Sequence, residues 1–204
     1  MLKIDEIFFS AQGEGIRFGI PSLFIRLAGC SLRCDYCDTE RSWAGGFGVS
    51  ENDLVIQVEH FRNDYPQFQV VITGGEPFEQ DIAPFVHRLK QMDYFVCIET
   101  NGSVYFETEI DWFTLSPKDV LNFRIDDRFK SRINEFKLIV NENLTISHVQ
   151  EVSANAPSVP VFLQPNHKNP NRYRDTYDFY LACIQNGIHN IRLGMQLHRI
   201  YDID

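Results

Sequence analysis

The sequence predicts an α/β fold in the form of an open, partial (β/α) barrel of about six parallel strands. Short apolar runs alternate along the chain with segments of helical spacing, which is typical of a parallel sheet covered by helices. A closed eight-stranded barrel takes about 250 residues, and the 204 residues of this chain supply too few strands for one. We therefore expect the sheet to stay open.

The predicted strands are near-continuous apolar runs, and most of them end in a polar turn. They lie at 22–29, 69–77, 94–102, 111–118, 133–140, 159–165 and 189–198. The predicted helices lie at 49–64, 79–92, 143–156 and 173–187. Ser50, followed by Asp53, can cap the first helix, and Gly187 ends the last. The connection over 119–132 is charged and weakly patterned, so we expect it to lack a full helix.

Composition predicts a single domain over 1–204. The chain is 44% hydrophobic and contains seventeen Phe, which suits one sizeable core. Its net charge of −9 argues against a general nucleic-acid-binding protein, because such proteins present a basic face. No apolar run approaches the roughly 20 residues that cross a bilayer, and the N-terminus lacks a signal-peptide pattern. Five cysteines, three of them clustered, do not form a disulfide framework, so we expect reduced thiols and a cytoplasmic protein without membrane partners.

Four polar turns fall where predicted strands end. They are GGEP (74–77), ETNG (99–102), SPK (116–118) and LQP (163–165). In parallel α/β folds the carboxyl ends of the strands line the binding crevice. The turns should therefore converge on one edge of the sheet, beside the cysteine-rich loop that follows the first predicted strand.

That loop, GCSLRCDYCDT, carries Cys30, Cys34 and Cys37 in a C-x3-C-x2-C spacing, with no fourth cysteine or histidine close by. Structural zinc takes four protein ligands and catalytic zinc three, while iron–sulfur clusters usually take four thiolates. Thiolates suit both metals, and the spacing favours iron–sulfur. Three thiolates on a [4Fe–4S] cluster leave one iron open, and such an iron can chelate a ligand through amine and carboxylate groups.

With an aromatic residue before its last cysteine, this segment resembles the signature of the radical S-adenosylmethionine superfamily. The resemblance implies a radical SAM type of partial barrel and a [4Fe–4S] cluster whose open iron binds S-adenosylmethionine. Reductive cleavage of that cofactor then gives a 5′-deoxyadenosyl radical, which abstracts hydrogen. Each turn alone is also an ordinary β–α connection, and their order along the chain supports the resemblance. The residues that it assigns to S-adenosylmethionine are Tyr36, Gly74, Gly75, Glu76, Glu99, Asn101, Ser116, Lys118 and Gln164.

The Q-G-E-G segment ahead of Arg26, together with the C-terminal RLGMQLH, resembles the 7-carboxy-7-deazaguanine synthase family. This resemblance implies a carbon–nitrogen lyase that rearranges 6-carboxy-5,6,7,8-tetrahydropterin to 7-carboxy-7-deazaguanine, with loss of ammonia, in 7-deazapurine (queuosine-type) biosynthesis. It also implies a homodimer, a flavodoxin or ferredoxin electron donor, an N-terminal substrate-binding segment over about 1–20 and a Mg²⁺ ion at Thr39. The residues that it assigns to the substrate are Gln12, Gly13, Glu14, Gly15, Arg26, Gly75 and His198.

The chemistry of these side chains suits a carboxylated pterin. Gln12 and Glu14 can pair with its guanine-like edge, and Arg26 can bind its carboxylate in a bidentate manner. Each residue also has a structural interpretation. Arg26 can pair with a neighbouring carboxylate, the Q-G-E-G segment can be a solvated turn, and His198 can be a surface residue. Asp38 can serve as the Mg²⁺ ligand in place of Thr39 or merely cap the loop.

Two other functions remain open at this level. A glycyl-radical enzyme activase uses the same cysteine spacing on a protein substrate, although we expect it to lack the Q-G-E-G segment. A non-catalytic iron–sulfur or zinc protein would have a fully ligated metal that S-adenosylmethionine cannot perturb. The chain also departs from the family by ending in IYDID. Cys97 and Cys183 lie in apolar contexts, and we interpret both as core residues.

Overall fold

The computed structural model describes residues 1–203, and its described strands form one nine-stranded sheet. The strands are β1 (Leu2–Ala11), β2 (Pro21–Leu27), β3 (Phe47–Val49), β4 (Gln69–Gly74), β5 (Val96–Thr100), β6 (Trp112–Leu115), β7 (Glu135–Val140), β8 (Val161–Pro165) and β9 (Ile191–Leu193). Their order is β3-β1-β2-β4-β5-β6-β7-β8-β9, with β3 and β9 at the two edges. The predicted open sheet is thereby confirmed.

The strands β2, β4, β5, β6, β7, β8 and β9 pair in parallel with their neighbours in that order, while β1 pairs antiparallel with both β2 and β3. Each parallel strand matches a predicted one, and the expected count of about six is close. The sequence analysis missed β1 and β3. Most residues of β1 are only half-buried, so its sequence shows neither a continuous apolar run nor a clean alternation.

Five helices accompany the described sheet: α1 (Glu51–Asp64), α2 (Ala83–Gln91), α3 (Ile146–Asn155), α4 (Arg172–Gln185) and α5 (Leu197–Tyr201). The first four match the predicted helices. Ser50 caps α1, because its Oγ accepts a hydrogen bond from Asp53 N at 3.1 Å. The connection over 119–132 contains only two short 3₁₀ turns, Asp119–Leu121 and Asp127–Phe129, as predicted.

The last predicted strand, 189–198, is wrong in its second half. β9 ends at Leu193 and the chain turns into α5. Gly194 N still donates to Leu163 O at 2.8 Å, but Leu197 N donates to Gly13 O at 3.1 Å. The chain thus leaves the sheet to meet the N-terminal segment.

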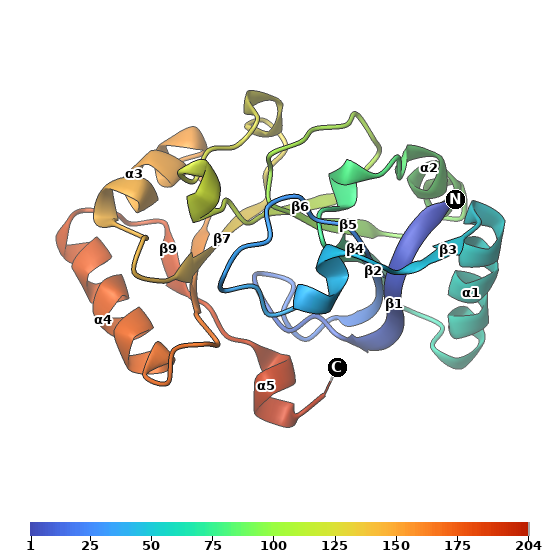
Figure 1. The fold of residues 1–204 in the computed structure, drawn as a ribbon, viewed down its shortest axis with the longest axis horizontal. Helices are drawn as coiled ribbons and strands as arrows, with labels where there is room; N and C mark the ends of the chain where they lie inside the picture. Colours follow the sequence, from blue (N-terminus) through green and yellow to red (C-terminus); the bar gives the residue numbers. More distant parts are fainter. Residues whose placement is uncertain (204) are drawn as a thin grey trace.

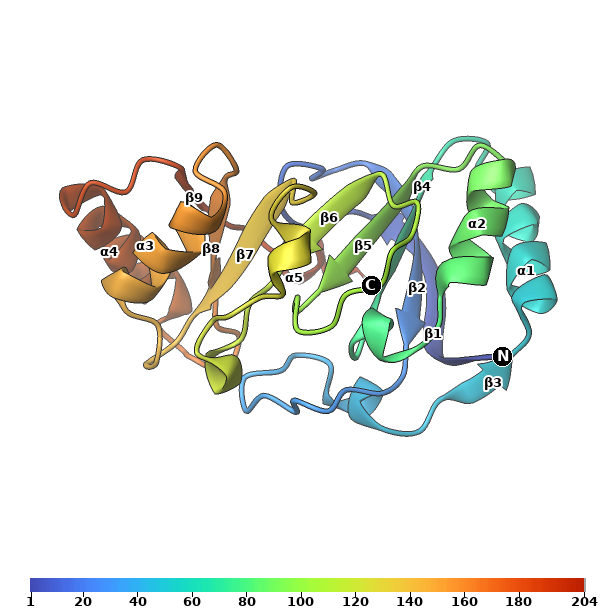
Figure 2. The same cartoon turned by 90° about the horizontal axis from the view of Figure 1, so that it is seen from above.

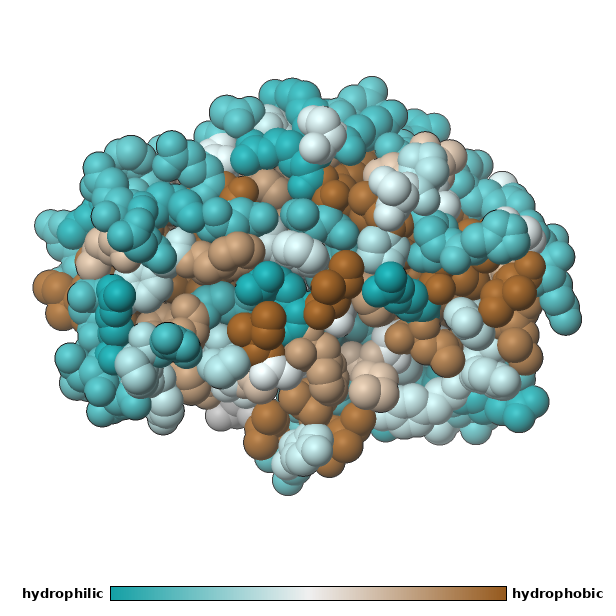
Figure 3. All heavy atoms as spheres, turned by 180° about the vertical axis from the view of Figure 1, so that it is seen from behind, coloured by the Kyte–Doolittle hydropathy of each residue, from teal (hydrophilic) through white to brown (hydrophobic). Residues whose placement is uncertain are grey.

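Figure 1 shows α1 and α2 at one end of the sheet and α3 and α4 at the other, with the cysteine-rich loop crossing in front. Seen from above, that loop runs along the side towards which the central strands point (Figure 2). Figure 3 shows the opposite face, where polar and apolar residues mix and α5 projects at the lower edge. Among residues 1–203, no helix is both long and apolar enough to span a membrane.

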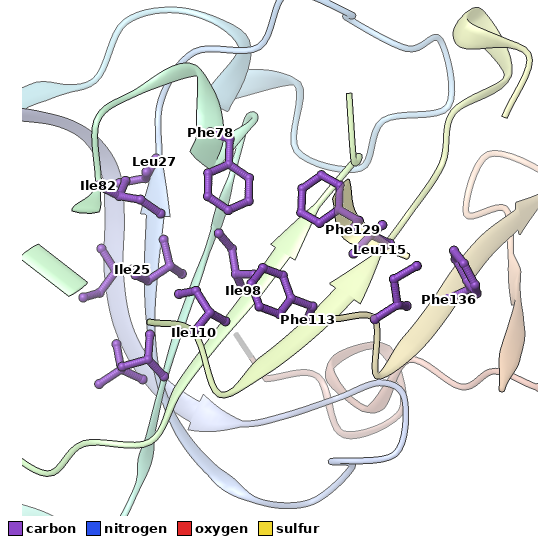
Figure 4. Close-up of a cluster of buried hydrophobic side chains, with 14 of the residues drawn as sticks. Ile25, Leu27, Phe78, Ile82, Ile98, Ile110, Phe113, Leu115, Phe129 and Phe136 are labelled. Atoms are coloured by element: carbon purple, nitrogen blue, oxygen red, sulfur yellow. The ribbon is translucent and has the colours of Figure 1, made fainter. Parts of the chain in front are cut away.

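The main core lies between the sheet and its covering segments. Ile25, Ile98 and Phe113 from β2, β5 and β6 meet Phe78 and Phe129, which come from 3₁₀ turns (Figure 4). The rings of Phe78 and Phe129 lie 5.9 Å apart between centroids. Successive side chains of a strand point to opposite faces, so the residues that alternate with these core residues lie on the other face of the sheet.

Polar residues occupy that other face. In β7, Glu135 and Lys137 alternate with the core residues Phe136 and Leu138, and all four are buried. In β5, Glu99 alternates with Ile98 in the same way. The sheet therefore carries its main apolar core on one face, and on the other it carries these charged groups beside a small apolar cluster of Phe24, Val71 and Cys97.

Candidate active site

A cavity of about 660 Å³ lies at the carboxyl ends of the parallel strands, between the cysteine-rich loop and the segment after β1. Its size suits a small-molecule site. Of the residues predicted for the site, those that line it are Gln12, Gly13, Glu14, Arg26, Cys30, Cys34, Tyr36, Cys37, Thr39, Gly74, Gly75, Glu99, Asn101, Ser116, Lys118 and His198. Gly15, Glu76 and Gln164 are not among the lining residues.

The cysteine loop, defined here as residues 29–39, contains three free thiols on the cavity wall. Cys37 N donates to Cys34 O at 3.0 Å, and Thr39 N donates to Cys37 Sγ at 3.4 Å. Burial raises the pKa of Cys34, against the opposing charge of Lys118. In residues 1–203 no group of three or more His, Cys, Asp or Glu side chains converges to hold a single metal ion. Three separate thiols nevertheless suit a cluster, in which each thiolate binds its own iron.

The GGEP turn packs directly against the start of the cysteine loop. Glu76 N donates to Gly29 O at 2.8 Å, and Gly75 N donates to Leu27 O at 2.9 Å. A Cβ on Gly75 would overlap Gly29 O, so only glycine allows this approach. The turn therefore fixes the loop at the residue that precedes the first cysteine.

Glu76 acts within the protein and does not face the cavity. Its carboxylate accepts hydrogen bonds from Thr100 Oγ1 at 2.6 Å, Asn101 N at 2.7 Å and Phe78 N at 3.1 Å. Burial raises the pKa of this fully buried side chain to about 7, although these three donors act to lower it. Glu76 thus connects the end of β4 to the end of β5. The part of the turn that lines the cavity is Gly74 and Gly75.

Gly15 and Gln164 do not line the cavity, but both pack close to residues of the site. Gly15 has φ +70°, and a Cβ there would overlap the carboxylate of Glu135. That carboxylate accepts from Ile16 N at 2.6 Å and from Thr114 Oγ1 at 2.7 Å. Gln164 is fully buried beneath the cavity, and its Oε1 has no hydrogen-bond partner among the described residues.

Opposite the cysteine loop stands a polar wall, formed by Gln12, Glu14, Glu99, Lys137 and Gln196. Lys137 Nζ lies 2.6 Å from Glu14 Oε2 and 3.1 Å from Glu99 Oε2. Gln12 Nε2 donates to Glu99 Oε1 at 3.1 Å, and Gln196 Nε2 donates to Glu14 Oε1 at 3.0 Å. The Q-G-E-G segment is therefore an interlocked part of the wall, and its interpretation as a solvated turn is wrong.

The charges in the wall support one another. Burial acts to lower the pKa of Lys137, but the carboxylates of Glu14 and Glu99 outweigh it and raise that pKa. Burial acts to raise the pKa of Glu99, but the charge of Lys137 and the bonds from Lys137 and Gln12 lower it. The wall thus holds one ammonium between two carboxylates.

Sequence reasoning missed Lys137 as a site residue. Its signal is a single charge inside the apolar run EFKLIV, because a buried charge must be paired. Its partners come from β5 and from the segment after β1, and no local pattern identifies them.

Arg26 pairs with a neighbouring carboxylate and also lines the cavity. Its Nε lies 3.4 Å from Glu6 Oε2, and its side chain is 20% exposed on the cavity wall. Arg41 pairs with the same Glu6 carboxylate and, at 3.1 Å, with Asp5 Oδ2. Because Arg26 meets Glu6 through Nε, its outer nitrogens keep donors for an anion in the cavity.

His198 and Thr39 lie at the rim of the cavity. His198 is half-buried on α5 beside Gly13, and burial lowers its pKa. Thr39 Oγ1 donates to Asp38 Oδ1 at 3.2 Å, which leaves its lone pairs free to bind a cation. Burial acts to raise the pKa of Asp38, but the charges of Lys137 and Lys118 outweigh it and lower that pKa.

Residues 24–142 match the model of the Radical SAM superfamily, and the chain is a member of that superfamily. The 7-carboxy-7-deazaguanine synthase of Bacteroides thetaiotaomicron is 36% identical over 203 residues, which cover 100% of this chain and 99% of that protein. The corresponding protein of Rickettsia prowazekii is 33% identical over 214 residues, covering 100% and 89%. Within the superfamily, the chain belongs to the 7-carboxy-7-deazaguanine synthase family.

The fold agrees with this family. The crystal structure of QueE from Escherichia coli superposes with a TM-score of 0.78 and 30% identity, covering 97% of this chain and 94% of that one. Membership of the superfamily implies a [4Fe–4S] cluster and S-adenosylmethionine as cofactors. The three thiols on the cavity wall fit that cluster.

Proposed function

We propose that this protein is a 7-carboxy-7-deazaguanine synthase that rearranges 6-carboxy-5,6,7,8-tetrahydropterin to 7-carboxy-7-deazaguanine, with loss of ammonia. The observation that carries the proposal is the pairing of two walls across one cavity. The cysteine loop offers three thiols, and the polar wall opposite offers amide and carboxylate groups. The full-length likeness to named synthases supports the same function.

When bound at Cys30, Cys34 and Cys37, the cluster together with S-adenosylmethionine supplies a 5′-deoxyadenosyl radical. The protein positions the cofactor and excludes water. We assign the cofactor's contacts to the strand-end turns, namely the backbone of Gly74 and Gly75 and the side chains of Asn101, Ser116 and Lys118. Lys118 Nζ donates to Ser116 Oγ at 2.8 Å, so the two side chains act as one polar unit.

The substrate is held by the polar wall and by Arg26. The 2-amino-4-oxo edge of a pterin carries adjacent N–H donors, for which Glu14 and Glu99 are acceptors. Arg26 binds the substrate carboxylate, because a guanidinium matches that planar group. Glu99 bonds to Gln12 and Lys137 and belongs with this substrate group, in place of the S-adenosylmethionine group to which its motif assigned it.

Thr39 would hold a Mg²⁺ ion, which would in turn attract the substrate carboxylate. Mg²⁺ takes oxygen ligands and keeps several waters, so one hydroxyl and one substrate oxygen suffice as anchors. We expect Thr39→Val to abolish the stimulation of turnover by added Mg²⁺, and Thr39→Ser to retain it. Equal stimulation of both variants would remove Thr39 from the ion's shell.

The deciding experiment incubates the reduced, cluster-loaded protein with S-adenosylmethionine and the carboxylated tetrahydropterin. We expect 7-carboxy-7-deazaguanine and ammonia in equal amounts, measured by mass spectrometry and an ammonia assay. Cleavage of S-adenosylmethionine without a deazaguanine product would contradict the substrate and favour another radical reaction. An EPR spectrum of the reduced protein that S-adenosylmethionine leaves unchanged would contradict the open iron and favour a non-catalytic metal protein.

The same family supports three further assignments. The protein acts as a homodimer, takes its electrons from a flavodoxin or ferredoxin and works in the cytoplasm. A glycyl-radical activase is the less favoured function, because its substrate is a protein, whereas the full-length relatives carry the synthase name. Sedimentation of the loaded protein and reduction by each candidate donor test these assignments.

A further inference from the structure

Lys137 is a buried cation at the centre of the polar wall. Its side chain is only 11% exposed, and its Nζ lies 2.6 Å from Glu14 Oε2 and 3.1 Å from Glu99 Oε2. Two carboxylates this close to one another would share a proton if they lacked a cation between them, because like charges disfavour ionisation. With Lys137 between them, both carboxylates can stay ionised.

The two carboxylates keep acceptor capacity on the cavity side. Each ionised carboxylate has about four lone-pair sites. Glu14 accepts from Lys137 and Gln196, and Glu99 accepts from Lys137, Gln12 and, at 3.4 Å, Thr73 Oγ1. Both residues line the cavity, so their remaining sites face a ligand.

An ionised carboxylate accepts hydrogen bonds and donates none, whereas a protonated one can also donate. The 2-amino-4-oxo edge of a pterin presents two adjacent donors, the ring N–H and the amino group. A 2-oxo edge, as in the lumazine analogue, replaces the amino donor with an acceptor. The protonation state of Glu14 and Glu99 therefore decides which of these heterocycles fits.

On these grounds, and resting on the proposed function, we propose that Lys137 is a positioning residue that sets specificity for the 2-amino edge of the substrate. It does so by holding Glu14 and Glu99 as a fixed pair of acceptors. In this role Lys137 acts on the substrate through these two carboxylates.

Other charged groups surround the pair, and a test by pH must account for them. Lys137 lowers the pKa of Glu99, against burial, and Arg26 acts in the same direction. The titratable or charged groups that face Glu14, Glu99 and Lys137 from neighbouring elements are Arg26 on β2, Asp38 on the cysteine loop and His198 on α5. Of these groups, His198 has the ordinary pKa closest to neutral pH, and burial lowers that pKa, so the same pH series is run with His198→Gln.

The experiment measures the binding of 6-carboxypterin and of its 2-oxo analogue, 6-carboxylumazine, to the cluster-loaded protein with S-adenosylmethionine by calorimetry. In the unaltered protein we expect a preference for the 2-amino ligand that is constant between pH 6.5 and 8.5. In Lys137→Met the preference should fall at least about tenfold at pH 6.5, since one pKa unit changes the ionised fraction tenfold below the pKa. It should recover as the pH rises, because the carboxylates then lose their proton.

Variants and controls separate this role from a structural one. Lys137→Gln keeps hydrogen-bond donors without the charge and should behave as Lys137→Met, whereas Lys137→Arg should keep the preference. Lys90→Met is the matched control. It removes a half-buried ion pair, Lys90 Nζ to Asp111 Oδ2 at 2.5 Å, whose members do not line the cavity, and it should leave the preference unchanged.

Each outcome decides one statement. A preference that falls between pH 8.5 and 6.5 both in the wild type and in His198→Gln would overturn the role of Lys137 even if no Lys137 variant folds. Folded Lys137→Met and Lys137→Gln with the wild-type preference at every pH would overturn it as well, while leaving the proposed function intact. A wild-type protein that binds neither ligand would overturn the proposed function itself.

Discussion

The cysteine loop and the polar wall face the same cavity, but the chain builds them in opposite ways. The loop takes its three thiols from one stretch, residues 30–37, and each thiol is free. The wall draws its five side chains from positions between Gln12 and Gln196, and each side chain is bonded to another member. A contiguous site can lose one residue while the rest stays in place. In an interlocked site, one change releases the partners of the lost side chain.

The largest effect that we expect is on the loop. Cys34→Ala should remove the cluster and lower activity by more than about a hundredfold, which is the upper range for losing even an outer partner of a metal site. Iron content and visible absorbance measure the cluster. The fold should persist, because a loop residue is lost and the sheet is untouched. Cys183→Ala is the control, since this buried thiol of α4 lies outside the cavity and should keep the iron. Full iron content in Cys34→Ala would show that the loop is not the cluster site.

Glu76 holds the start of the cysteine loop, because its backbone N donates to Gly29 O, and it should make stability depend on pH. Its folded pKa of about 7 lies above the unfolded value of 4.5, so the folded state holds a proton that the unfolded state has lost. Its contribution is therefore full below about pH 4.5 and is lost as the pH rises towards 7, by up to about 3 kcal/mol. Urea unfolding at several pH values should show this slope in the wild type and not in Glu76→Gln. Parallel curves for the two proteins would remove Glu76 as the cause.

A smaller effect should follow from Gly15→Ala, which tests how tightly the wall is fixed. Gly15 has φ +70° and lies against the Glu135 carboxylate, so a methyl group there should cost about 1–2 kcal/mol. We expect KM for the pterin to rise by about tenfold, with kcat little changed, because Glu14 moves and the cysteine loop does not. Gly19→Ala, at φ +82° with nothing close to its added methyl, is the matched control. A fall in kcat alone would place the effect on the other side of the cavity.

The smallest effect should come from a surface salt bridge beside the cysteine loop. Lys168 Nζ lies 2.5 Å from Glu40 Oε1, and the two side chains are 42% and 51% exposed. Exposed pairs contribute about 0–1 kcal/mol. Lys168→Ala should therefore change the unfolding free energy by less than about 1 kcal/mol, and less still in high salt. A loss that salt does not reduce would indicate that the backbone contact of Lys168 with Asp35 O carries the effect.

The same contrast explains what the sequence could predict. The thiols and the GGEP turn could be predicted because each is a short, contiguous sequence motif. The parallel strands could be predicted because they are apolar runs. Lys137 was missed because its partners lie on β5 and in the segment after β1, and only the folded chain brings Glu99 and Glu14 to it. Glu76 and Gly15 were predicted as ligand contacts. Their residue types were informative, but the sequence does not distinguish a side chain that faces the cavity from one that braces it.

The bond between Gln196 Nε2 and Glu14 Oε1 spans 182 positions of the chain. During synthesis Glu14 therefore leaves the ribosome long before its partner exists, while the cysteine loop is already complete. All three cysteines are therefore present in the nascent chain before the polar wall is complete. A chain interrupted before Gln196 would retain the three cysteines and four members of the polar wall, but its Glu14 would lack this bond.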